Sequence, residues 1–418
     1  MVSAVVLGSA LATLSFNLAN GGFTPLAPFL LPEELVGWAL SLQGCVSCAG
    51  LFMAGPLVDS FGSHTVLKRG LEMLAIGLVS IAVAPAFGSS WLQVLAVVPM
   101  GGSSAAIFSA SRAFIADHFA DPLRSQHLGN VISVGVIGSL SGSPLVGWLF
   151  VAASNLDMSL RTTVALAPIL IVVLFAYIAV RSIRVEPSMA PSPAKDAGET
   201  LFMVGNPFNV IRQFLGVFQS MGPQAWLLVT MLMTTFGAQN ALLCATGVEL
   251  KARGHSASTM AGVSVPSQIV SLFASPIAGR LAGQPGNQKP LSMWSLAIFA
   301  GGLFAAPVAA RMLEPTWLPV VLMVCLAVSQ FASSLLESPA ASAMVDLAAA
   351  KSVGNGRALM ASEFGVSLGD MVGPYCGSAI LRSMGFEALC HVIGGMLVLS
   401  AGLCAMFWRS QGEKTKSS

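Results

Sequence analysis

Charged residues are scarce in this sequence. Lys, Arg, Asp and Glu make up 9% of its 418 residues, whereas soluble globular domains carry about 25%. Because 55% of the residues are hydrophobic and the mean hydropathy is +0.79, the chain has more apolar surface than a water-soluble fold can bury. The shortage of charge therefore excludes a soluble protein and predicts an integral multi-pass membrane protein in a lipid bilayer.

The patterns typical of enzymes and of nucleic-acid-binding proteins are also missing. The 20 basic residues are scattered and the net charge is +2, so we expect no nucleic-acid partner. Cys45 and Cys48 have C-x-x-C spacing, but no second pair or neighbouring His completes a metal site. The sequence has no P-loop and no nucleophile–base set. We therefore predict no enzyme, no ATP-driven pump, no metal and no cofactor.

Long apolar runs are what the sequence does have. A helix needs about 20 apolar residues to cross a bilayer. This criterion predicts an all-α membrane protein with twelve transmembrane helices in two pseudo-symmetric six-helix halves. The predicted spans are residues 4–31, 35–57, 71–87, 91–114, 128–153, 163–180, 225–243, 260–281, 291–309, 317–344, 358–381 and 389–408.

A polar stretch rich in Pro, Ala and Ser separates the two halves. The predicted domains are an N-terminal half at 1–181, a cytosolic linker at 182–224, a C-terminal half at 225–408 and a cytosolic tail at 409–418. Within the linker, Asn206 and Pro207 suit the N-cap and first turn of a helix. Apolar residues follow at helical spacing, which predicts an interfacial helix.

The distribution of basic residues predicts the orientation. With both termini in the cytosol, fourteen of the 20 Lys and Arg residues fall in cytosolic segments and five in external loops, while Arg112 lies within a span. Basic residues are enriched in cytosolic loops, so this topology is favoured over its inverse. No address signal separates the plasma membrane from a vesicle or a vacuole.

An internal repeat relates the two halves. With Pro144 set over Pro374, small residues recur at every fourth position of "GVIGSLSGSPLVG" and "GVSLGDMVGPYCG". The aligned pairs are Gly135 with Gly365, Ser139 with Gly369, Ser143 with Gly373, and Gly147 with Gly377. A second alignment sets Gly62 over Gly286. Small-residue stripes allow close helix packing in any membrane protein, but two in matching spans indicate a duplicated fold, as in secondary transporters.

Short motifs carry a family resemblance. The segment "GPLVDSFG", from Gly55 to Gly62, resembles the G-x-L-a-D-r-x-G signature of the major facilitator superfamily. "DPLRSQHLG" resembles the family's loop after span four, and "GSPLVGW" and "GPYCGS" resemble its antiporter motif. The resemblance covers essentially the whole chain and implies alternating access about a midplane cavity. It implies a cytosolic gate, with Asp59 capping a helix start, formed by Gly55, Asp59, Gly62, Arg112 and Arg124.

Within the superfamily, residues 344–386 are similar to the vesicular amine transporters and related drug:proton antiporters. Glu363 falls where that branch has a functionally important aspartate. The other amine-recognition positions are not intact, because the branch's acid in span seven falls on Gln239 and its lysine in span two on Gln43. Asn17 matches an amide in span one. The resemblance implies that these three amides line the cavity, with a role in helix packing as the alternative.

Ionisable groups at membrane depth are costly, and their default interpretation is functional. Glu337 lies nine residues before Asp346, and Glu363 nine residues after Gly354, which places each about 13 Å from a helix end. Asp370 shares a helix face with Glu363 about two turns further on. No Lys or Arg is expected at that depth on spans one, two, seven, eight, ten or eleven. We predict that Glu363, Glu337 and Asp370 couple protons or cations, with plain hydrogen bonding as the alternative.

These observations predict a monomeric secondary transporter. It would exchange protons for a small organic solute, an amine-like or drug-like cation. One alternative is a proton-independent facilitator of a neutral solute. Another is a transporter-like receptor that moves no solute. The sequence identifies neither the solute nor the coupling stoichiometry.

Overall fold

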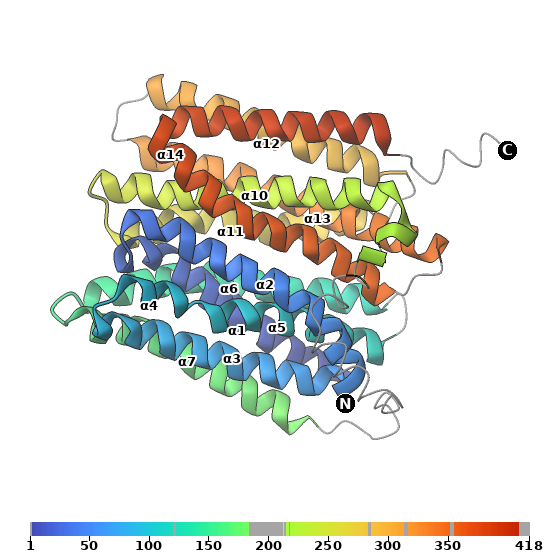
Figure 1. The fold of residues 1–418 in the computed structure, drawn as a ribbon, viewed down its shortest axis with the longest axis horizontal. Helices are drawn as coiled ribbons and strands as arrows, with labels where there is room; N and C mark the ends of the chain where they lie inside the picture. The colour runs from blue at the N-terminus through green and yellow to red at the C-terminus, as the bar shows by residue number, and fades with distance from the viewer. Residues whose placement is uncertain are drawn as a thin grey trace. The chain divides into compact units, whose positions relative to one another are not determined.

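The main elements of the chain are helices. The computed structural model describes residues 2–119, 123–183, 212, 215–216, 218–282, 286–312, 317–351 and 355–408. The predicted tail and most of the predicted interfacial helix lie outside these residues. The elements (Figure 1) are α1 (Val2–Leu30), α2 (Glu33–Phe61), α3 (Ser63–Val83), the 3-10 helix η1 (Ala84–Phe87), α4 (Ser90–Leu95), α5 (Val98–His118), α6 (Leu123–Ala152), α7 (Met158–Ser182), α10 (Pro223–Ala252), α11 (Ala257–Ala282), α12 (Gln288–Met312), α13 (Leu318–Ala350) and α14 (Asn355–Phe407).

The helices account for the predicted spans. Within the described residues, eleven candidate spans are long and apolar enough to cross a membrane. The last helix, α14, has 53 residues, and Gly385 inside it has non-helical backbone angles (φ 83°, ψ 175°). This residue divides α14 into segments 355–384 and 386–407, each long enough to span a bilayer. The predicted all-α, twelve-span architecture is confirmed once α14 is counted as two spans.

The predicted spans 35–57 and 71–87 leave a non-helical connection between them, but the residues from 58 to 70 are almost entirely helical. The helix α2 continues to Phe61, and α3 begins at Ser63. Only Gly62 interrupts them, with a positive φ of 81° that side chains disfavour. Its aligned partner Gly286 has a φ of 84°. The expectation failed because a change from apolar to polar residues marks the edge of the hydrocarbon layer, whereas helical hydrogen bonds continue beyond it.

The predicted span 91–114 is interrupted in the structure. The short helix α4 ends at Leu95, and α5 begins at Val98. Pro99 lies in the first turn of α5. Because proline has no N–H to donate and its ring crowds the preceding turn, it is favoured in the first turn of a helix and disfavoured further inside one.

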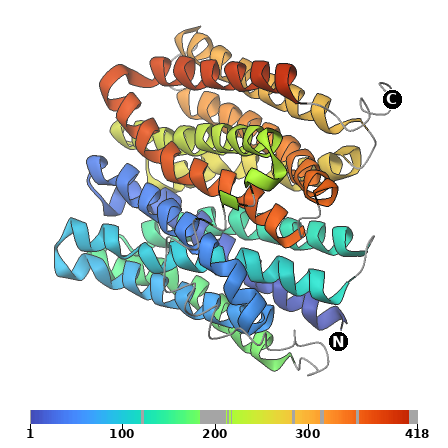
Figure 2. The same cartoon turned by 45° about the vertical axis from the view of Figure 1, so that its right-hand side comes forward.

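The chain forms two compact units with the same packing pattern. Unit 1 comprises Met1–Leu31 and Cys45–Val217, and unit 2 comprises Pro32–Gly44 and Phe218–Ser418. In unit 1, α1 packs mainly against α6, and α3 packs against α5 and α7. In unit 2, α10 packs mainly against α14, and α12 packs against α13 and α14 (Figure 2). The first span therefore packs on the fifth, and the third on the fourth, within each unit, as a duplicated fold requires.

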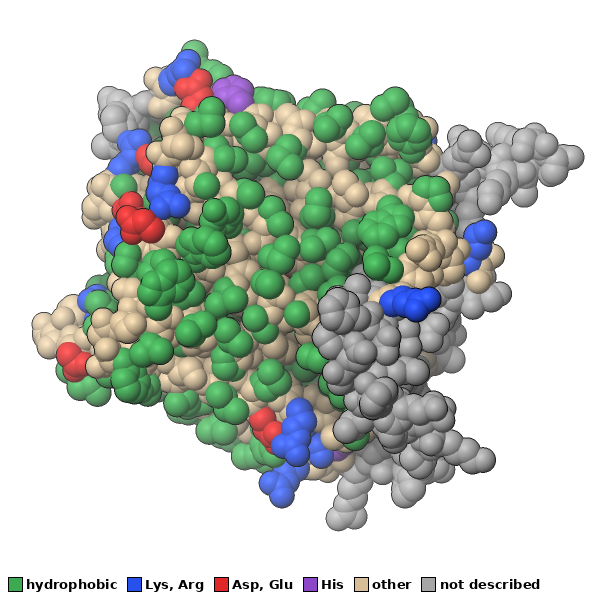
Figure 3. Space-filling model, in the orientation of Figure 1, with side chains coloured by type: hydrophobic (Ala, Val, Ile, Leu, Met, Phe, Trp, Pro, Cys, Tyr) green, Lys and Arg blue, Asp and Glu red, His purple; other side chains and the backbone are tan. Residues whose placement is uncertain are grey.

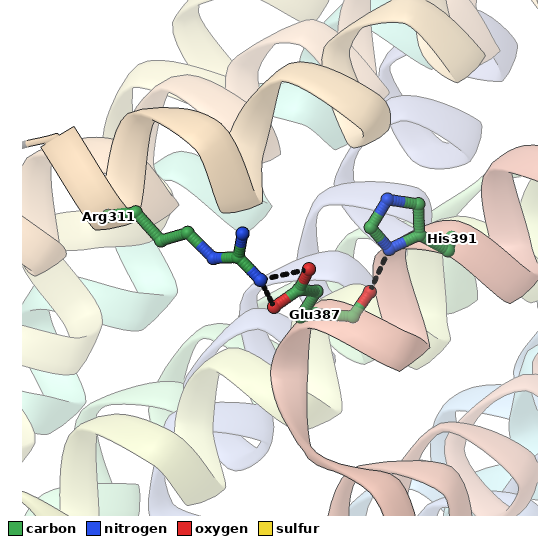
Figure 4. Close-up of polar contacts among 3 residues, drawn as sticks. All are labelled: Arg311, Glu387 and His391. Atoms are coloured by element: carbon green, nitrogen blue, oxygen red, sulfur yellow. Dashed lines mark hydrogen bonds and ion pairs between the residues drawn. The ribbon is translucent and has the colours of Figure 1, made fainter.

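A turn at Gly385 reverses the chain between the two segments of α14. Just beyond it, Glu387 pairs with Arg311 at the end of α12, with 2.5 Å between the charged groups (Figure 4). His391 Nδ1 lies 2.8 Å from the Glu387 carbonyl oxygen on the next turn. Both partners of the ion pair are exposed, so the pair stabilises the turn by at most about 1 kcal/mol.

Candidate functional site

Glycines of α14 pack closely against the backbone of α10 in unit 2. A Cβ added at Gly369 would lie 2.6 Å from the Gly237 nitrogen and 2.9 Å from the Met233 oxygen. A Cβ at Gly377 would lie 2.6 Å from Cα of Ala241. Gly365 and Gly373 contact the same helix. Because the facing atoms are mostly backbone, side chains at these positions would force the helices apart.

Gly237 on α10 is a partner that our sequence interpretation missed. It faces both Gly369 and Gly373. The stripe on α14 was visible from its four-residue spacing, and Gly237 begins a matching row of small residues on α10 with Ala241 and Ala245. This row could have indicated the facing surface, since Ala241 lies opposite Gly377.

The close approach of these helices positions a carboxyl group beside an amide. Asn240 Nδ2 on α10 donates a hydrogen bond of 2.7 Å to Asp370 Oδ1 on α14. The same nitrogen donates to the Phe236 carbonyl oxygen at 3.0 Å, which fixes the rotamer of Asn240. Asp370 follows Gly369 directly, so the glycine contact and the hydrogen bond are two parts of one interface. The described partner of this membrane-depth carboxyl group is thus a neutral donor.

The other two predicted coupling residues also belong to unit 2. Glu363 is half-buried on α14 and near enough to Asp370 for their charges to interact. Glu337 is half-buried on α13, three residues after Ser334. All three acids therefore lie on two helices of one compact unit.

A chain of neutral polar side chains crosses unit 2 near these acids. Gln239 on α10 donates to the Gln330 side-chain oxygen on α13. Gln330 Nε2 donates to Ser271 Oγ on α11 at 3.3 Å, and Ser271 Oγ lies 3.0 Å from Ser334 Oγ on α13. The side-chain oxygen of Gln239 is buried and has no hydrogen-bond partner. Gln239 therefore keeps one unused hydrogen-bond acceptor in this chain of side chains.

The first part of α2 contacts the same region of α14. A Cβ at Gly44 would lie 2.5 Å from the Met371 nitrogen and 2.7 Å from the Asp370 carbonyl oxygen. Ser41 Oγ accepts a hydrogen bond of 3.0 Å from the Tyr375 N–H, one residue after Pro374, where the helical ladder lacks a donor. Gln43, predicted to line the cavity, is buried in this segment. The sequence did not indicate that residues 32–44 belong with the C-terminal helices.

In unit 1, Asn17 lies in the contact between α1 and α6. Its Nδ2 donates to the Thr13 carbonyl oxygen at 2.9 Å, and its Oδ1 accepts from Ser139 Oγ at 3.3 Å. A Cβ at Gly135 would lie 2.8 Å from the same Nδ2. The nitrogen of the amide bonds its own helix and the oxygen bonds α6, which favours the helix-packing alternative for Asn17.

The glycines of α6 that approach α1 most closely differ from those expected. A Cβ at Gly138 would lie 2.5 Å from the Leu14 carbonyl oxygen, and Gly142 faces the Leu18 carbonyl oxygen. These two residues lie beside the predicted row, in which Gly135 faces Thr13 and Asn17 of α1 and Ser139 faces Gly21. The predicted row therefore contacts α1, and Gly138 and Gly142 widen the contact.

Comparison with known proteins identifies the family. The sequence profile of the Major Facilitator Superfamily matches residues 5–362. The chain belongs to this superfamily. No curated protein sequence matches it.

Solved structures of superfamily transporters share the fold. The xylose transporter XylE from E. coli, in a partially occluded inward-open conformation, matches with a TM-score of 0.70 and 14% identity over 98% of both chains. A second structure, the proton:xylose symporter XylE bound to 6-bromo-6-deoxy-D-glucose, matches with a TM-score of 0.65 and 14% identity over 98% of this chain and 96% of that one. At this identity the likeness shows the fold alone. Family and fold together support a multi-pass secondary transporter.

The structure describes the backbone of the superfamily's gate signature but only some of its side chains. Asp59 lies in the last turn of α2, and the N-cap of α3 is Gly62, which makes no side-chain cap hydrogen bond. The capping role expected of Asp59 stays a prediction. Arg112 is half-buried on α5. The side chains of Asp59 and Arg124 lie outside the described residues, so their gate role stays a prediction.

Proposed function

We propose that this transporter exchanges protons for an amine-like or drug-like organic cation. The observation that carries the proposal is the Asp370 carboxyl group, at membrane depth and within charge-interaction range of Glu363, with the neutral Asn240 as its described partner. A carboxyl group at membrane depth costs free energy, so its default interpretation is functional. We assign this carboxyl group a role in proton coupling.

The three acids have related roles in this proposal. Glu363 and Glu337 release a proton when a cationic solute enters and take one up when it leaves. Asp370 is linked to Glu363 by their charge interaction, so loading of one site alters the other. Exchange follows because the acids hold either protons or the cation, and alternating access presents them to each side in turn.

Neutral polar groups complete the proposed cavity. Gln239, with its unused buried acceptor, and Gln43 would bind the polar part of the solute. The gate residues Gly55, Asp59, Gly62, Arg112 and Arg124 would close the cytosolic side. Asn17 would act through the α1–α6 contact.

A second function is favoured by one specific feature. The chain from Gln239 through Gln330 and Ser271 to Ser334 is entirely neutral. Such a chain suits the hydroxyl groups of an uncharged solute. A facilitator of a neutral solute that moves no protons is therefore the alternative.

Proton flux in proteoliposomes tests the proposal. The purified protein is reconstituted with a pH-sensitive dye inside, and amines, polyamines, cationic dyes and xylose are added outside. Xylose is included because both structural neighbours are structures of a xylose transporter. The variants are Glu363→Gln and Asp370→Asn. The matched control is Glu387→Gln, which neutralises an exposed acid in an ion pair at the Gly385 turn.

The outcomes separate the alternatives. Cation-triggered proton movement that persists in the Glu387 variant and is lost in the other two supports antiport. Solute uptake without proton movement, equal in all variants, contradicts coupling and leaves a facilitator. Binding of a solute without uptake in any variant contradicts transport and leaves a receptor.

A further inference from the structure

A basic pocket lies between α3 and α7 in unit 1. It has a volume of about 330 Å³ and is lined by Thr65, Lys68, Arg69, Glu72, Tyr177 and Arg181. Three basic residues against one acid give the lining a net positive charge. The acid is already engaged, since Arg69 pairs with one oxygen of Glu72 at 2.6 Å and the Tyr177 hydroxyl donates to the other at 3.1 Å. The pocket therefore suits an anion.

The two helices that form the pocket are tied together on both sides of it. His64 Nε2 on α3 lies 2.8 Å from the Val180 carbonyl oxygen on α7. Near the opposite ends of the helices, Ser159 Oγ donates to the Ala82 carbonyl oxygen at 3.3 Å. Because α3 and α7 are held at two separate points, the basic residues keep their spacing without a ligand. A preorganised site of this kind loses little entropy when it binds.

The pocket lies where the charged and apolar parts of a lipid would meet. Arg181 is in the last turn of α7, and Lys68 lies about 8 Å along α3 from its start. From the pocket toward the end of α3 and toward the start of α7, large apolar side chains are exposed. Ile76 is 56%, Leu174 49% and Ile178 61% exposed. On the face drawn in Figure 3, basic and acidic side chains gather beside a surface that is mainly hydrophobic.

We propose that this pocket binds the phosphate-bearing headgroup of an anionic phospholipid. The Arg guanidinium and Lys ammonium groups bind the phosphate oxygens, because both donate charge-assisted hydrogen bonds. The acyl chains lie along the exposed apolar side chains of α3 and α7. Basic pockets between transmembrane helices recognise acidic headgroups in this way. A soluble phosphate would gain nothing from the apolar surface, which is why a lipid is the occupant.

Native mass spectrometry of the purified full-length protein tests the site. The protein is titrated with phosphatidylglycerol and, separately, with phosphatidylcholine, and the dissociation constant of the first bound lipid is measured. The variant is Lys68→Gln combined with Arg181→Gln. The matched control is Arg280→Gln, which removes an exposed basic residue in the last turn of α11. Gel filtration of each variant establishes that it is folded.

We expect phosphatidylglycerol to bind more tightly than phosphatidylcholine. The double variant should weaken phosphatidylglycerol binding about fivefold for each charge removed, while Arg280→Gln leaves it unchanged. Equal weakening in the double variant and the control would overturn the proposal, because it indicates general attraction between charges. Displacement of the lipid by inorganic phosphate at equal concentration would also overturn it, since the site would then recognise a free anion.

Discussion

Replacing Gly369 by Ala tests whether the contact between α10 and α14 depends on the absence of a side chain. The new Cβ would lie 2.6 Å from the Gly237 nitrogen, 2.9 Å from the Met233 oxygen and 3.0 Å from the Phe236 carbonyl carbon. All three are backbone atoms, so no rotamer change relieves the overlap. An ordinary contact begins near 3.4 Å, so the helices must separate by roughly 0.8 Å or distort.

The expected cost follows from two opposing effects. Overpacking of a close contact destabilises by about 1–3 kcal/mol, whereas Ala in a helix is favoured over Gly by about 1 kcal/mol. Gly395→Ala separates them, because Gly395 is also in α14 and a Cβ there would contact nothing within 4 Å. The propensity gain is common to both variants and cancels in their difference. Gly369→Ala should therefore be less stable than Gly395→Ala by about 1–3 kcal/mol.

Thermal unfolding of the two variants in the same detergent measures this difference. Gly369→Ala should have the lower midpoint. Under the proposed function its solute-triggered proton movement should also fall, because the bond between Asn240 and Asp370 depends on the same helix separation. If Gly369→Ala is as stable as Gly395→Ala, the helices do not need glycine at this contact. The glycine stripe of α14 would then not be what positions Asp370.

Three further outcomes follow from single contacts. Gly62→Ala and Gly385→Ala should each lower the unfolding midpoint, because alanine at a positive φ introduces backbone strain of about 1–3 kcal/mol. An added Cβ would contact nothing within 4 Å at either position, so an unchanged midpoint would contradict the positive φ. Gln330→Leu should cost about 1–3 kcal/mol, because it leaves the half-buried Gln239 amide without its described partner, and an unchanged midpoint would show that water replaces the chain. Arg311→Gln should change stability by at most about 1 kcal/mol and leave uptake unaffected, and a larger effect would show that the pair with Glu387 is less exposed than the structure has it.

The fold was largely predictable because burial in lipid leaves a strong signal. Each apolar run of about 20 residues must become a helix that satisfies its own backbone, and the prolines at 144 and 374 fixed the alignment of the halves. The ends of helices were less predictable. The polar segment after Gly55 remains helical in α2 and α3. Hydropathy indicates where the chain leaves the bilayer, whereas the positive φ of Gly62 marks the turn between the two helices.

The site was predictable in its residue types but not in its contacts. Asp370 and Glu363 stood out because charge is rare inside a span. That Asn240 would bind Asp370 was missed, because it depends on which face of α10 meets α14, and the row of small residues from Gly237 was not recognised. Ser41 and Gly44 were missed for a related reason. They lie in α2, yet they contact residues more than 300 positions away in α14, and nothing local to residues 32–44 distinguishes them from the rest of α2.

The contact of residues 32–44 with α14 has a consequence for alternating access. Ser41 and Gly44 approach α14 at Asp370 and Tyr375, on either side of Pro374, where a helical N–H is missing. A change at Asp370, such as the loss of a proton, therefore acts on a backbone that is already less constrained and is in contact with α2. Since α2 continues beyond Gly44 into the residues of unit 1, it is the described helix shared by both units. Under the proposed mechanism, a change in the protonation state of Asp370 would act on residues 32–44 of α2, within unit 2.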